Sequence, residues 1–141
     1  MKRSVQDLAL LILRCGLASV FLFHGSQKTL SWFGGSGIGS FAGYLARIGV
    51  PYSLFAAILA AWSEFLGGLS LLSGLWTRHL LVPLAATMTV ATAVDARAGF
   101  DSSRGGAEFA LLCLCCILAV WLLGPGRFSL PAPTLGGKEA Q

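Results

Sequence analysis

One apolar run near the start of the chain carries three ionisable side chains and constrains the fold more than any other feature. The run extends from residue 8 to residue 30 and contains Arg14, His24 and Lys28. About 20 apolar residues cross the hydrocarbon core of a bilayer, and ionisable groups at that depth are expensive and usually functional or paired. On an α-helix, Arg14, Phe21 and Lys28 share one face, with His24 slightly off axis. The run therefore predicts a membrane-spanning helix whose polar stripe faces other helices.

The composition of the chain argues against an ordinary soluble domain. Hydrophobic residues make up 55% of the 141 residues and charged residues 11%, whereas soluble domains carry about 25% charged residues. The net charge of +4 is modest and no basic stripe with interleaved aromatics occurs, so we expect membrane lipid and no nucleic acid as a partner. Lys2 and Arg3 could open a signal peptide, but the apolar run is too long and contains Arg14, which favours a retained anchor.

Four apolar segments predict an all-α membrane protein, a bundle of four transmembrane helices. We expect these helices at about residues 8–30, 52–76, 80–98 and 106–123. A short interfacial helix between the first two is predicted by apolar side chains that recur at helical spacing: Phe41, Tyr44, Leu45 and Ile48. Residues 1–130 should form a single domain, and the proline- and glycine-rich residues 131–141 a disordered tail.

The placement of lysine and arginine predicts the orientation of the bundle. Cytoplasmic segments carry an excess of these residues. With both ends of the chain inside, the cytoplasmic side holds Lys2, Arg3, Arg78, Arg127 and Lys138. The opposite side holds Arg47, Arg97 and Arg104, with Lys28 near the edge. The bias favours an N-in, C-in topology.

This topology brings the polar side chains together at two depths. Glu64 lies at the middle of the second helix, within reach of the long Arg14 side chain, so we expect Arg14 and Glu64 to form a structural ion pair. His24, Lys28 and Glu108 fall at similar depth near the outer face, and we expect His24 to pair with Glu108 there. Such a set suits a quinone site, a transport pathway or purely structural pairing.

Motifs for other cofactors are missing from the sequence. No Cys/His metal spacing occurs, and no haem, flavin or nicotinamide pattern is present, so we expect no metal site. Cys113, Cys115 and Cys116 cluster in the fourth predicted helix. Buried cysteines usually act as small hydrophobes, which favours an inert role, although Cys113 and Cys116 share a helix face and a redox pair stays open.

Five segments of the sequence resemble the DoxX family of small bacterial membrane proteins, over about residues 8–130. They are the arginine of the first helix, HGSQK at its end, WSEFLGGLSLLSGLWTR around Glu64, GGAEFA at the start of the fourth helix and the closing GPGRFSL. Family members often carry an aspartate after the final Ser-Leu, where this chain has Pro131. The matching polar positions are Arg14, His24, Lys28, Glu64 and Glu108.

The resemblance implies a four-helix bundle in the bacterial inner membrane and a link to DoxD-type subunits of thiosulfate:quinone oxidoreductase. We therefore expect a quinone-interacting subunit of a redox complex that acts with partner subunits or as a homo-oligomer. His24, Glu108 and Lys28 are the expected catalytic residues. Phe21 and Phe109 would pack the quinone ring between His24 and Glu108. The alternatives are a non-catalytic membrane scaffold or chaperone and a small-solute or proton carrier.

Overall fold

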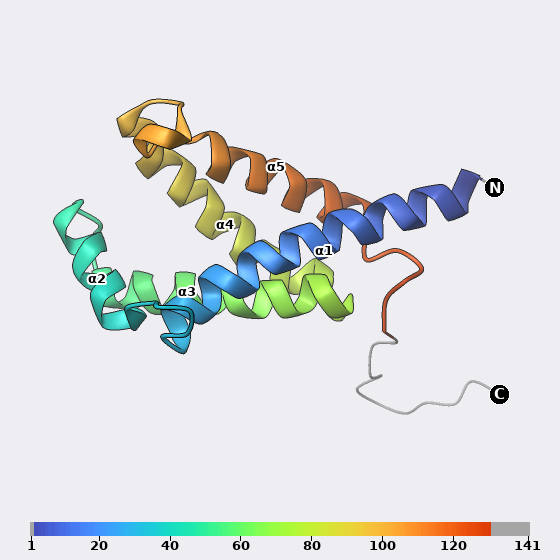
Figure 1. The fold of residues 1–141 in the computed structure, drawn as a ribbon, viewed down its shortest axis with the longest axis horizontal. Helices are drawn as coiled ribbons and strands as arrows, with labels where there is room; N and C mark the ends of the chain where they lie inside the picture. Colours follow the sequence, from blue (N-terminus) through green and yellow to red (C-terminus); the bar gives the residue numbers. More distant parts are fainter. Residues whose placement is uncertain (1, 131–141) are drawn as a thin grey trace.

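The computed structural model describes residues 2–130, and within them the chain is helical and contains no β-strand (Figure 1). The predicted all-α class is confirmed. The α-helices are α1 (Lys2–Thr29), α2 (Gly37–Arg47), α3 (Ser53–Ser73), α4 (Thr77–Asp95) and α5 (Glu108–Leu123). Two 3-10 turns, η1 (Ala96–Ala98) and η2 (Ser102–Arg104), connect α4 to α5. The predicted tail, 131–141, lies outside the described residues.

The helix bounds differ from the predicted ones mainly at two places. Helix α1 begins at Lys2 rather than at residue 8, because the polar residues before the apolar run include no helix breaker. Helix α4 begins at Thr77 rather than at residue 80, because the turn before it is very short. Gly74 and Trp76 both adopt positive φ angles, 80° and 48°, which reverse the chain within three residues.

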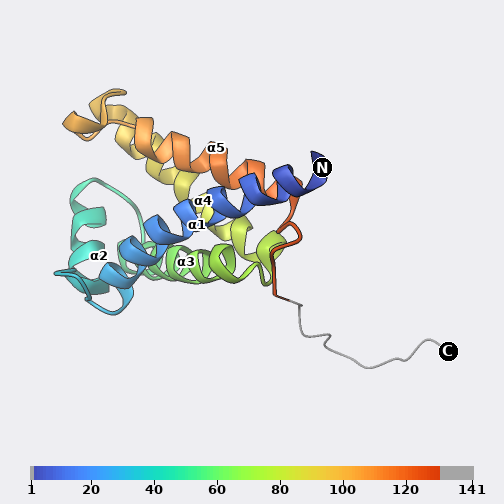
Figure 2. The same ribbon diagram turned by 45° about the vertical axis from the view of Figure 1, so that its right-hand side comes forward.

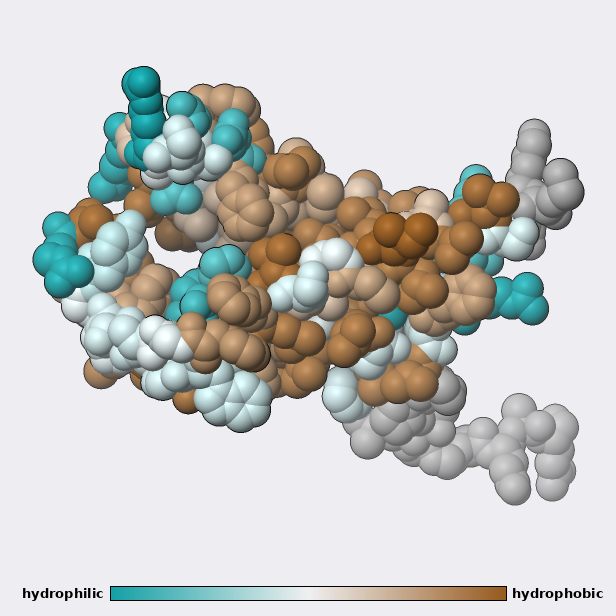
Figure 3. Space-filling model, viewed as in Figure 1, coloured by the Kyte–Doolittle hydropathy of each residue, from teal (hydrophilic) through white to brown (hydrophobic). Residues whose placement is uncertain are grey.

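Three helices of the described chain are long and apolar enough to cross a membrane: Ser4–Thr29, Ser53–Ser73 and Thr77–Ala98. Helix α5 is a shorter apolar helix of 16 residues. Figure 3 shows apolar residues along the middle of one face, with hydrophilic residues gathered toward its two ends. The protein therefore has the surface of a helical membrane protein.

Helices α1 and α3 run antiparallel and form the closest helix pair of the bundle (Figures 1 and 2). Glycines make this approach possible, since small residues let helix backbones pack closely. A Cβ atom added at Gly25 would lie 2.6 Å from the backbone nitrogen of Phe65, and one added at Gly68 would lie 2.9 Å from that of Leu22. This pairing sets the register that places Lys28 beside Glu64.

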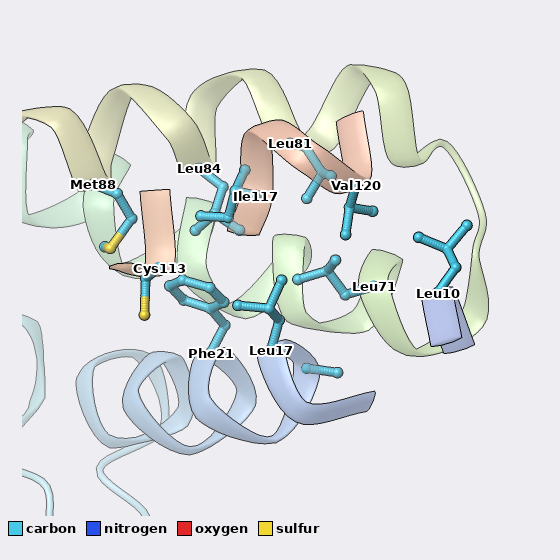
Figure 4. Close-up of a cluster of buried hydrophobic side chains, with 11 residues drawn as sticks. Leu10, Leu17, Phe21, Leu71, Leu81, Leu84, Met88, Cys113, Ile117 and Val120 are labelled. Carbon is cyan, nitrogen blue, oxygen red and sulfur yellow. The ribbon is translucent and has the colours of Figure 1, made fainter. Parts of the chain in front are cut away.

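The buried core lies between α1, α3, α4 and α5 (Figure 4). Its fully buried members include Leu71 from α3, Leu84 from α4 and Ile117 from α5. Phe21 from α1 and Cys113 from α5 extend the same cluster. This core separates the two ends of the molecule, which differ in their polar contacts.

We name the two ends by their contents. The Arg14 end contains the start of α1, the turn between α3 and α4, and residues 124–130. The cavity end contains the end of α1, the start of α3, α2, and the connection between α4 and α5. Helix α2 runs across the direction of α1 and α3 at this end, as both views show (Figures 1 and 2).

Candidate ligand site at the cavity end

A cavity of about 460 Å³ lies between α2, α3 and α4, with α1 contributing Lys28 to its wall. Its walls are mainly apolar, as is usual for small-molecule sites of about 300–1,000 Å³. The face in Figure 3 is hollowed between α2 and the α4–α5 connection. The polar side chains that line the cavity are Lys28, Tyr44, Ser63, Glu64, Thr87 and Asp95.

The ion pair between Lys28 and Glu64 is the central polar feature of this cavity. Lys28 Nζ lies 2.6 Å from Oε1 and 2.6 Å from Oε2 of Glu64, so it donates to both carboxylate oxygens. The Glu64 side chain is 4% exposed and that of Lys28 is 24% exposed. The ammonium also lies 4.7 Å from the centroid of the Phe41 ring, within cation–π distance. A buried carboxylate is therefore held by a cation that still borders open space.

A second polar contact lines the same wall, between α3 and α4. The hydroxyls of Ser63 and Thr87 lie 2.7 Å apart. Ser63 also contacts the Ala60 carbonyl at 2.9 Å, and Thr87 contacts the Pro83 carbonyl at 3.0 Å. This pair lies beside Glu64 at the inner end of the cavity, since Ser63 and Glu64 are adjacent in α3.

The outer end of the cavity reaches the last turn of α4. Asp95 is half-buried there, and it also lines an adjoining hollow together with Tyr44 and Arg97. Arg97 of η1 donates to the Ile48 carbonyl at 3.3 Å and so joins the turn after α4 to the end of α2. Eight residues of α4 separate Thr87 from Asp95, so the inner and outer polar groups are about 12 Å apart along the helix.

Arg14 lies at the opposite end of the molecule and does not pair with Glu64, which corrects the sequence-based prediction. Its side chain is 1% exposed. Its Nε donates to the Leu71 carbonyl at 2.9 Å, and its Nη2 to the Leu72 carbonyl at 3.3 Å. Its Nη1 donates to the carbonyls of Pro125 and Phe128, at 2.5 and 2.9 Å.

The physical reason for this difference is the supply of free carbonyls at the end of a helix. The last carbonyls of a helix have no partner within it, and a cation near that end is favoured by the helix dipole. Arg14 meets those of α3 and ties residues 125–128 to them. Gly74 leaves room for the guanidinium, because a Cβ there would lie 2.8 Å from Nη2. Lys28 is left as the partner of Glu64.

The predicted pairing of His24 with Glu108 is also wrong. Glu108 Oε1 accepts hydrogen bonds from the backbone nitrogen of Ser102, at 3.1 Å, and from the Ser102 hydroxyl. These bonds close the loop before α5, a local arrangement that the linear sequence did not indicate. Nearby, Asp101 accepts hydrogen bonds from Ser103, which lower the pKa of the Asp101 carboxyl.

Of the two phenylalanines expected to pack a quinone ring, one lies near His24 and the other lies in the core. The ring of His24 lies edge-on to that of Phe109, with centroids 6.5 Å apart, so the end of α1 does meet the start of α5. Phe109 is 48% exposed, but Phe21 is 2% exposed within the core. Neither His24 nor Glu108 lines the cavity. The catalytic roles expected of His24, Glu108 and Lys28 stay predictions.

Sequence reasoning missed the cavity because the segment that lines one side of it was expected to lie at the interface and cap the bundle, without a space beneath it. Phe41 and Tyr44 of α2, and Ile48 directly after this helix, all line the cavity. The sequence did contain a signal for the ion pair. Gly25 and Gly68 fix where the antiparallel helices α1 and α3 meet, and this register determines which side chains face each other. Lys28 follows Gly25 by one turn.

The possible metal-ligating and thiol side chains of the described residues are placed as follows. No group of three or more His, Cys, Asp or Glu side chains among them is arranged to hold a metal ion. Cys15, Cys113, Cys115 and Cys116 are free thiols. Cys113 is buried in the core and Cys115 is exposed on the outer face of α5.

Long apolar helices that bury an arginine and an ion pair define a helical membrane protein. The chain belongs to the DoxX family, whose model matches residues 9–96. The match contains Arg14, His24, Lys28 and Glu64 and ends before Glu108. No curated protein and no solved structure matches the chain.

Proposed function

We propose that this protein is a quinone-interacting membrane subunit of a redox complex, and that the quinone ring enters the cavity between α2, α3 and α4. The observation that carries the proposal is the Lys28–Glu64 pair on the wall of a largely apolar cavity of about 460 Å³. A quinone ring is apolar on its faces and polar at its oxygens, which matches such walls. The cavity therefore replaces the region of His24 and Glu108 as the proposed site.

The residues on the cavity wall suit the recognition of a quinone ring. Glu64 can accept or hold a proton, and the Lys28 ammonium can donate a hydrogen bond to a ring oxygen that displaces Glu64 or Phe41 from it. The rings of Phe41 and Tyr44 lie 6.4 Å apart with an interplanar angle of 14°, so α2 offers a stacked aromatic surface to the ring. Electrons would pass through the bound quinone and a partner subunit or a second copy of this chain.

We further propose that α5 is a fourth membrane span and that α2 lies at the membrane interface. Helix α5 is about 24 Å long, slightly short for a hydrocarbon core of about 30 Å. Its outer face is nonetheless apolar, with Leu112, Leu118 and Leu122 exposed, and it packs along α4. The crosswise course of α2 (Figure 1) suits a helix at the interface.

The proposed location is the bacterial inner membrane, with both ends of the chain in the cytoplasm. Arg78 and Arg127 lie at the Arg14 end, whereas Arg47, Arg97 and Arg104 lie at the cavity end. The family relationship and the bias of lysine and arginine support this orientation. The cavity then opens on the outer side.

Quinone retention in a mild detergent tests the proposal. Wild-type protein should carry quinone, measured by solvent extraction and mass spectrometry. Ala60→Phe places a large ring in the cavity wall and should remove most of that quinone. Ala93→Phe is the matched control, because Ala93 is exposed on α4 and does not line the cavity. His24→Gln should also retain quinone.

The main alternative is a membrane scaffold whose buried charges only stabilise the bundle. It is favoured by the observation that each buried side-chain nitrogen and oxygen of the described residues has a hydrogen-bond partner. Wild-type protein free of quinone, or equal quinone in Ala60→Phe and Ala93→Phe, would replace the quinone proposal with the scaffold. If His24→Gln loses quinone and Ala60→Phe does not, the quinone site lies at the junction of α1 and α5 instead.

A further inference from the structure

The cavity wall offers a ligand more hydrogen-bond acceptors than donors. Acceptors face the cavity in excess, because the side-chain donors on its wall, except the Tyr44 hydroxyl at the exposed end, are already used within the protein. We infer that the cavity selects the reduced, hydroxyl-bearing quinol over the oxidised quinone. This inference rests on the proposed function and adds to it the oxidation state of the preferred ligand.

Lys28 has little capacity left for donation. Its ammonium carries three hydrogens, and two contacts of 2.6 Å engage both oxygens of Glu64. The remaining side of the ammonium faces the ring of Phe41. A quinone oxygen that accepts from Lys28 must therefore displace either Glu64 or Phe41.

The two hydroxyls on the inner wall are committed in the same way. Ser63 and Thr87 each have one hydrogen, and three contacts share them: with each other, with the Ala60 carbonyl and with the Pro83 carbonyl. In every arrangement of those contacts both hydrogens stay inside the protein. What the hydroxyls offer to a ligand is lone pairs, which accept hydrogen bonds.

The carboxylates add further acceptors. An ionised carboxylate accepts only, with about four lone-pair positions, and Lys28 occupies only part of this capacity at Glu64. Asp95 at the outer end makes no hydrogen bond or ion pair with the described residues, 2–130. Against these acceptors, Tyr44 at the exposed end supplies one hydroxyl donor that the described chain leaves unbonded.

The formal charge of the wall points in the same direction. One cation, Lys28, stands against two carboxylates, Glu64 and Asp95, which leaves one negative charge. Such a wall disfavours anionic ligands and favours neutral ligands that donate hydrogen bonds. A quinol carries two hydroxyl donors, whereas the quinone of the same ring carries only acceptors. An acceptor facing another acceptor leaves both unpaired, which is costly in a buried site.

Direct binding to protein in nanodiscs tests this inference. Three tritiated probes share one ring and tail: decylubiquinol, kept reduced without oxygen, decylubiquinone, and the dimethyl ether of decylubiquinol, which lacks donors. Empty nanodiscs correct for partition into lipid. We expect the quinol to bind about tenfold tighter than the other two, the gain of roughly one net hydrogen bond.

Two variants assign the preference to the inner wall. Ser63→Ala combined with Thr87→Val removes both hydroxyl acceptors and should reduce the quinol preference at least threefold. Thr89→Val is the matched control, because Thr89 bonds to the Ala85 carbonyl one turn back, as Thr87 does to Pro83, but does not line the cavity. This control should keep the full preference.

The outcomes separate this inference from the proposed function. Equal binding of quinol and quinone, or tighter binding of quinone, overturns the inference and leaves a quinone site in place. An unchanged preference in the Ser63→Ala, Thr87→Val protein also overturns it, since the hydroxyls would then play no part. If none of the three probes binds above empty nanodiscs, both the inference and the quinone proposal fail.

Discussion

Arg14 and Lys28 lie on the same helix, 14 residues or about 21 Å apart, yet their surroundings differ completely. Arg14 is fully buried and donates to four backbone carbonyls, from α3 and from the segment after α5. Lys28 pairs with one side chain, Glu64, and borders a cavity. Arg14 joins α3 to the segment after α5, whereas Lys28 has an open cavity beside it.

The comparison shows that depth in the membrane does not by itself identify a functional charge. An arginine has five donors in a rigid fork, and the end of a helix supplies the carbonyls that satisfy them without any carboxylate. A lysine that holds a carboxylate at a cavity wall can exchange its partner for a ligand. We therefore assign a stabilising role to the Arg14 end and propose ligand binding at the cavity end.

The largest effect is expected from Arg14→Met. The substitution strands the carbonyls of Leu71, Leu72, Pro125 and Phe128, and each unpaired buried carbonyl costs about 1–3 kcal/mol. We expect a steep fall in the free energy of unfolding, measured by SDS titration in mixed micelles. Arg14→Lys should recover only part of it, because lysine is a compact charge that does not reach all four carbonyls.

Arg104→Met is the control for that experiment, because the Arg104 side chain is 84% exposed. Its unfolding free energy should stay close to that of wild-type protein. Full stability of the Arg14→Met protein would contradict the role of Arg14 in joining the end of α3 to residues 125–128.

A smaller loss is expected when the ion pair at the cavity is broken on one side. Lys28→Met leaves Glu64 buried without its cation, at a cost of about 3–5 kcal/mol. Replacing Glu64 with methionine in the same chain should restore most of the loss. The double mutant Arg14→Met, Glu64→Met should instead show additive losses, since these two residues do not touch. Non-additive losses there would revive the Arg14–Glu64 pair.

The smallest of the three effects concerns the register that brings Lys28 to Glu64. Gly25→Ala forces α1 away from α3, because the new Cβ would meet Phe65 backbone atoms at 2.6 Å. Overpacking of this kind costs about 1–3 kcal/mol. Gly16→Ala on the same helix is the control, with nothing within 4 Å of its Cβ. Equal thermal stability of the two variants would argue against close packing at Gly25.

Much of the fold follows from the sequence, because the apolar runs determine where long helices form. The helices predicted at 8–30, 52–76, 80–98 and 106–123 correspond to α1, α3, α4 and α5, with shifts at their ends. The polar partners were harder to predict. They depend on how each helix is rotated about its axis and on which backbone carbonyls are free. Every residue type carries a backbone carbonyl, so the sequence does not show which carbonyls are free.

The site illustrates this limit. Depth alone placed Arg14 within reach of Glu64, but the free carbonyls at the end of α3 compete for the guanidinium. Depth also placed His24 near Glu108, and the rings of His24 and Phe109 do lie near each other. The Glu108 carboxylate instead accepts a hydrogen bond from the backbone nitrogen of Ser102, six residues earlier in the chain. The cavity forms because α2 packs on α3. The spacing of apolar residues in α2 predicted a helix at the interface but did not specify this contact.

Photolabelling with an azidoquinone tests the central claim most directly, namely that the ligand site lies at the cavity and not at the other polar clusters. The protein is labelled in its native membrane, digested and mapped by mass spectrometry. We predict that the label lies on cavity residues of α2 and α4, within 41–48 and 83–95, and that excess unlabelled quinone removes it. Label concentrated around His24 and Phe109, or label that excess quinone does not displace, would contradict the account.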